Sequence, residues 1–97
     1  MNIAELRANY PNPMDCLDND SFRNPAKYCV GGALCLSLGL PFNFPTPGIL
    51  WTAILQVNPK ANALYLVDQA AEVIKKNDAG DFEGAWAILA EALRESL

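Results

Sequence analysis

The sequence contains no histidine, and this absence excludes several kinds of catalytic and metal-binding site. Ser-His-Asp and Cys-His nucleophile pairs both need an imidazole, so the chain cannot build either one by itself. The three cysteines, Cys16, Cys29 and Cys35, lack a C-x-x-C spacing and cannot supply the four ligands of a zinc site. We therefore expect no metal ion and no cofactor, and acid–base chemistry would need a perturbed carboxylate, lysine or cysteine.

Positive charge is also scarce. The 97 residues include 7 basic and 11 acidic side chains, which gives a formal net charge of −4. Phosphate binding requires clustered lysine or arginine, so this balance predicts no nucleic-acid partner. The odd number of cysteines, together with an N-terminus that lacks a basic flank and an apolar run, predicts no secretion signal and a cytoplasmic location.

The middle of the chain lacks charge altogether, from Tyr28 to Pro59. A membrane-spanning helix needs about 20 mainly apolar residues in succession. Glycines and prolines between Gly39 and Gly48 divide the uncharged segment into two shorter pieces. We therefore predict a pair of buried helices and no membrane partner, with residues 39–47 forming a proline-rich connector.

Capping residues and helix breakers predict an all-α fold, a compact single-domain bundle of about four to five helices. Asn2 followed by Glu5 is typical of a capping box, while Pro25 and Gly39 mark the start and the end of a later helix. No stretch alternates with a period of two, so no strand is expected. The predicted elements within the single domain 1–97 are helices over 2–8, 48–57, 60–77 and 82–93, a helix with its start signal at Asn24-Pro25 that ends before Gly39, and a loop-rich segment over 9–26.

The predicted helix before Gly39 has one face made mostly of small residues, Cys29, Gly32, Ala33 and Leu36. Two adjacent glycines, Gly31 and Gly32, each cost roughly 1 kcal/mol relative to alanine in a helix. Close packing of a neighbouring helix is one explanation for them, and a ligand lying against the backbone is the other. Self-association through this face, which would give a homodimer, is a third possibility.

The run Tyr28-Cys29-Val30-Gly31-Gly32-Ala33-Leu34, followed by Asn77-Asp78 and a terminal amphipathic helix, resembles a small bacterial family of all-helical domains of unknown function. That family reads aromatic-Cys-x-x-Gly-Ala-Leu, then Asn-Asp, then a closing helix. The resemblance implies a compact helical domain and adds no activity. The chain departs from the family between these motifs, where it is neither basic nor histidine-bearing.

Cys29 and Asp78 are the candidate catalytic residues. A thiol near a helix start has its pKa lowered by the helix dipole, and Asp78 could lie over the glycine-bearing helix as a site carboxylate. The structural alternatives are that Cys29 packs in the core and that Asn77 and Asp78 form a turn, with Asn77 in a left-handed conformation.

Phe42 and Phe44 are the candidate binding residues, because a surface connector would expose them as an apolar patch. The leading hypothesis is a small cytosolic protein-interaction module, a regulator or inhibitor, whose protein partner contacts this patch. We expect most of the aromatic side chains Phe42, Phe44 and Trp51 of the uncharged segment to lie in the core. The alternative is a small-molecule binder or cysteine-dependent enzyme that uses Cys29 and Asp78, with Gly31 and Gly32 as binding residues.

Overall fold

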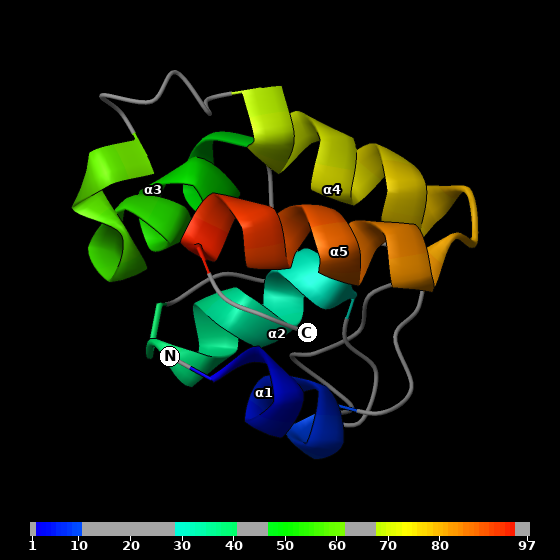
Figure 1. Ribbon diagram of the computed structural model, residues 1–97, viewed down its shortest axis with the longest axis horizontal. Helices are drawn as coiled ribbons and strands as arrows, with labels where there is room; N and C mark the ends of the chain where they lie inside the picture. The colour runs from blue at the N-terminus through cyan, green and yellow to red at the C-terminus, as the bar shows by residue number, and fades with distance from the viewer. Residues whose placement is uncertain (1, 11–28, 41–46, 62–67, 95–97) are drawn as a thin grey trace.

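A computed structural model describes residues 2–10, 29–40, 47–61 and 68–94, and these segments form an all-α bundle without a strand (Figure 1). None of the helices in these segments is long and apolar enough to cross a membrane. The helices are α1 (Ile3–Asn9), α2 (Val30–Ser37), α3 (Pro47–Val57), the 3-10 helix η2 (Pro59–Ala61), α4 (Asp68–Asp78) and α5 (Phe82–Leu93).

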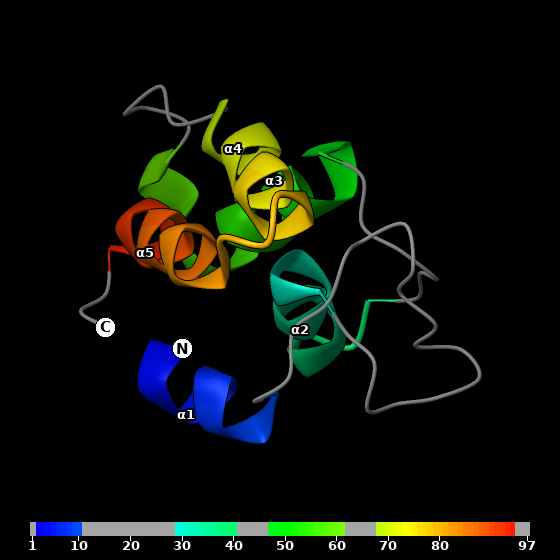
Figure 2. The same cartoon turned by 90° about the vertical axis from the view of Figure 1, so that its right-hand side faces the viewer.

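Helix α2 lies at the centre of the bundle. It contacts α1, α3, α4 and α5, and Figure 2 shows it between α1 and the other three helices. Every residue from Cys29 to Cys35 is buried, as expected for a helix that is apolar on all sides. Gly31 and Gly32 are among them, and of the small-residue face Cys29, Gly32 and Ala33 are buried while Leu36 is partly buried.

Helix α2 begins later than the sequence suggested. Cys29 has an extended backbone (φ −80°, ψ 167°) and is the N-cap, so the predicted continuous helix from Pro25 is wrong. Gly39 has a φ of +73°, which confirms it as the stop signal, because this left-handed conformation suits glycine.

Helices α4 and α5 form a hairpin of two neighbouring helices (Figure 1). Gly80 has a φ of +82° in the turn between them, whereas Asn77 belongs to α4, so the predicted left-handed Asn77 is wrong. Asp81 is the N-cap of α5, since its Oδ1 accepts a hydrogen bond of 2.9 Å from the Gly84 N–H.

The buried side of α4 consists of Ala70, Val73 and Asn77. Of the predicted helix over 60–77, residues 68–77 belong to α4, Pro59–Ala61 is a 3-10 helix, and residues 62–67 lie outside the described segments. Ile74 packs against the core while partly exposed, whereas Ala71 is exposed.

Helix α1 packs on the bundle through two aliphatic side chains. Ile3 is fully buried and Leu6 is 3% exposed. The predicted N-cap is present, because Asn2 Oδ1 accepts a hydrogen bond of 3.2 Å from the Glu5 N–H. Arg7 Nη2 donates to Glu83 Oε1 of α5, but both of these side chains are substantially exposed to solvent. Apolar burial therefore holds α1 in place more than this ion pair does.

Replacement of Ile3 by alanine should lower the free energy of unfolding by about 2–5 kcal/mol, because it removes buried methyl groups and leaves a cavity beneath α1. Arg7→Gln removes the exposed ion pair and the guanidinium that lies 5.7 Å from the centre of the Trp86 ring, and together these should cost no more than about 1–2 kcal/mol. Urea unfolding of both variants, followed by circular dichroism, measures the two effects. A larger loss for Arg7→Gln than for Ile3→Ala would show that the polar contacts of Arg7 hold α1.

Candidate functional site

The start of α2 is buried, and its backbone N–H groups therefore need acceptors inside the protein. The first four N–H groups of any helix have no partner within the helix. Cys29 supplies one acceptor, since its Sγ receives a hydrogen bond of 3.2 Å from the Gly32 N–H. Sulfur is a weak acceptor, so the thiol satisfies this end of the helix only in part.

Asn77 supplies the second acceptor from another helix. Its Oδ1 receives a hydrogen bond of 2.9 Å from the Val30 N–H. The same amide donates from Nδ2 to Asp78 Oδ1 at 3.4 Å. Among the described residues, Asn77 is the only buried polar side chain, with 1% of its surface exposed. The last turn of α4 therefore caps the first turn of α2.

The candidate residues Cys29, Gly31 and Gly32 lie at the start of α2, and the Asn77 amide connects this start to Asp78. Cys29 is fully buried, and Gly31 and Gly32 are buried as well. Asp78 is exposed at the end of α4, next to the amide that caps α2. The glycine backbone and the Cys29 thiol are thus enclosed by the bundle.

Cys35 lies one and a half turns further along α2 and is also a fully buried free thiol. Burial, and to a smaller extent the neighbouring Cys29, raises the pKa of the Cys35 thiol from 9.0 to about 12. A thiol with this pKa is fully protonated near pH 7 and is a poor nucleophile. In the part of the chain that the structure describes, no group of three potential metal ligands gathers.

Phe42 and Phe44 lie outside the described residues, and so their contribution to a binding surface stays a prediction. Trp51, on α3, packs against the core and is partly buried. The core side of α3 is formed by Leu50, Ala53 and Ile54. The opposite side of this apolar helix therefore faces solvent.

The capping role of Asn77 was missed by sequence reasoning. Its spacing did contain a signal, because Asn77 follows Ala70 and Val73 on one side of a helix and so occupies a core position. A buried amide requires hydrogen-bond partners, but the sequence does not say which helix provides them.

Comparison with known proteins identifies no relative: no family model, curated protein or solved structure matches the chain. The resemblance to the small bacterial helical family stays a prediction.

Replacement of Asn77 by alanine should lower the free energy of unfolding by at least about 1–3 kcal/mol, because the Val30 N–H loses its acceptor in a buried site. Asn77→Asp keeps an acceptor oxygen in place but adds a charge beside Asp78, so it should also destabilise the protein at pH 7. The loss in free energy of unfolding that Asn77→Asp causes should become smaller as the pH falls toward 4, since protonation of the new carboxylate removes the buried charge. Urea unfolding at both pH values tests this, and a deficit that is independent of pH would contradict it.

Alkaline pH should destabilise the protein through Cys35. The unfolded thiol ionises near pH 9, whereas the folded thiol keeps its proton until about pH 12. The contribution of the protonated Cys35 thiol to the free energy of unfolding is therefore complete below pH 9. Above pH 9 this contribution declines by up to about 1.4 kcal/mol per pH unit. Urea unfolding in a reducing buffer at pH 8, 9 and 10 should give a flatter dependence for Cys35→Ala than for the unmodified protein. Equal slopes would show that Cys35 does not titrate in this way.

Proposed function

We propose that the chain is a protein-interaction module, a regulator or inhibitor, that binds its partner through the uncharged face of α3. The half-buried Trp51 on this face is the observation that carries the proposal. We define the uncharged face as the exposed and partly exposed residues Ile49, Trp51, Thr52, Leu55 and Gln56.

The uncharged face has the composition of a protein interface. Trp51 and Leu55 are one helical turn apart and place an aromatic and an aliphatic side chain next to each other. Tryptophan is enriched at interaction hot spots, and charged residues are depleted at interface centres. Thr52 Oγ1 donates to the Gly48 carbonyl at 3.0 Å, so its hydroxyl proton already has a partner and its methyl group adds apolar surface.

The distribution of charge separates this face from the rest of the described surface. Charged residues occur on α1, η2, α4 and α5, whereas α2 and α3 have none. An ionised partner group pressed against the uncharged face would lose water and find no opposite charge. The partner surface that fits is therefore itself apolar and uncharged.

The predicted contact residues Phe42 and Phe44 adjoin this face along the chain. Their connector joins Leu40, which is partly buried, to Pro47 at the start of α3. Both ends of the connector therefore belong to the uncharged part of the molecule, and we include the two phenylalanines in the proposed binding surface.

The alternative function, a small-molecule binder or enzyme that uses Cys29 and Asp78, receives less support. Cys29 is fully buried and its sulfur accepts a hydrogen bond from the helix that it caps. These observations favour a structural role for the thiol, which leaves the surface of the bundle as the better candidate for function.

Site-specific photocrosslinking tests the proposal. A benzoylphenylalanine at Gln56, on the uncharged face, should crosslink one predominant protein in native lysate. The matched control carries the same group at Glu72, an exposed position on α4, and should not capture that protein. Thr52→Glu places a charge in the middle of the face and should reduce the yield from Gln56 about tenfold or more, because the carboxylate must be desolvated on binding.

Thr52 is exposed, so circular dichroism should show that Thr52→Glu leaves the helices intact. The same proteins captured from Gln56 and Glu72, or a crosslinking yield unaffected by Thr52→Glu, would contradict the proposal.

A further inference from the structure

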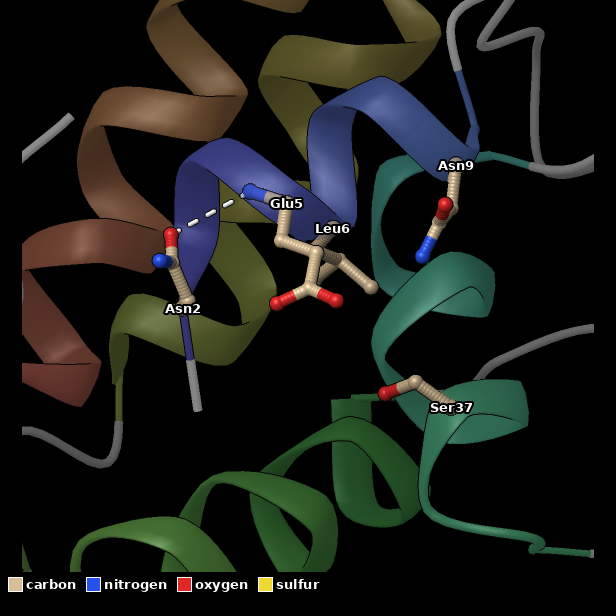
Figure 3. Close-up of a pocket in the computed structure, with 5 residues that line it drawn as sticks. All are labelled: Asn2, Glu5, Leu6, Asn9 and Ser37. Carbon is tan, nitrogen blue, oxygen red and sulfur yellow. Dashed lines mark hydrogen bonds between the residues drawn. The ribbon is translucent and has the colours of Figure 1, made fainter.

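A pocket beside α1 is separate from the uncharged face of α3. It has a volume of about 500 Å³ and is lined by residues of α1 and by one residue at the end of α2 (Figure 3). The lining residues are Asn2, Glu5, Leu6, Asn9 and Ser37. We call this feature the α1 pocket.

The spacing of the residues on α1 creates the pocket wall. Asn2, Glu5 and Asn9 are three and then four residues apart, so they share one side of the helix. Leu6 lies between them and is 3% exposed, which makes it the apolar floor. Figure 3 shows the Glu5 carboxylate, the Asn9 amide and the Ser37 hydroxyl turned toward the space between α1 and the end of α2.

Some polar atoms of the α1 pocket already form hydrogen bonds within the protein, and only the others are available to a ligand. Ser37 Oγ donates its proton to the Leu34 carbonyl at 2.7 Å, so it offers only lone pairs to the pocket. An ionised Glu5 carboxylate is an acceptor with no proton to donate. The Oδ1 of Asn2 is already engaged by the Glu5 N–H. Asn2 and Asn9 also present side-chain amides with N–H donors to the α1 pocket, and acceptors stand on both of its sides, the Glu5 carboxylate on α1 and the Ser37 hydroxyl oxygen on α2.

Among the described residues, no lysine or arginine lines the pocket or forms an ion pair with Glu5. A ligand that complements the carboxylate and the hydroxyl oxygen brings positive charge together with several N–H donors. A guanidinium group does both, because its planar donors match a carboxylate in a paired arrangement while other N–H groups remain free for a second acceptor.

From this arrangement we infer that the α1 pocket binds a small molecule that carries a guanidinium group, which pairs with Glu5 and reaches Ser37 Oγ across the pocket. The site is independent of the proposed protein-binding face, because no residue is shared between them. Failure of one proposal therefore leaves the other untouched.

Titration of the isotope-labelled protein with methylguanidinium chloride, followed by amide NMR shifts, tests the inference. Saturable shifts should centre on Glu5, Asn9 and Ser37. Glu5→Gln removes the charge at the same size, and glutamine is equally suited to this position of a capping box. It should weaken binding about tenfold or more, because hydrogen bonds between ionised partners are the strong ones.

Glu72→Gln is the matched control, since it makes the same change at an exposed position on α4 and should leave binding unchanged. Ser37→Ala should weaken binding severalfold through loss of the second acceptor. Tetramethylammonium chloride has the same charge but no N–H donor and should give no saturable shifts at these residues. Shifts that do not saturate, equal binding of tetramethylammonium, or an unchanged affinity in Glu5→Gln would overturn the inference.

Discussion

The hydrogen bond from the Val30 N–H to Asn77 Oδ1 is the interaction on which the arrangement of this bundle depends. A helix start buried among apolar side chains has no water to satisfy its N–H groups, so the protein must supply the acceptors. Cys29 provides a weak one and Asn77 a stronger one. Because Asn77 belongs to α4, this bond fixes the end of one helix over the beginning of another. Asp78 accepts from the same amide and helps to orient it.

A buried central helix also sets the positions of the surfaces that remain for function. Helix α2 is buried on all sides from Cys29 to Cys35, so its thiols and glycines lie in the interior of the bundle. Helix α3 packs on one side only, and the tryptophan on its flank stays partly exposed. The charged groups collect on the other described helices. The molecule thus combines an uncharged face, which we propose as the protein-binding surface, with a separate pocket lined by residues of α1 and α2.

Much of the fold was predictable because its signals are local. The asparagine and aspartate caps of α1 and α5, and the glycine that ends α2, act on backbone groups within a few residues of themselves. The errors have longer-range causes. Pro25 predicts a helix start, but Cys29 caps α2. Asn77 next to Asp78 predicts a turn, but Asn77 belongs to α4 and bonds to the start of α2.

The sequence by itself determined that the chain forms helices, where most of them end, and that histidine-dependent catalysis is excluded. Each of these follows from composition or from contacts between residues close in the chain. Tertiary structure alone decided that Asn77 faces the start of α2 instead of closing a turn, and that Ser37 faces the polar side of α1 across a pocket. Such pairings join residues far apart in the chain, and only the packing of whole helices sets which side chains meet.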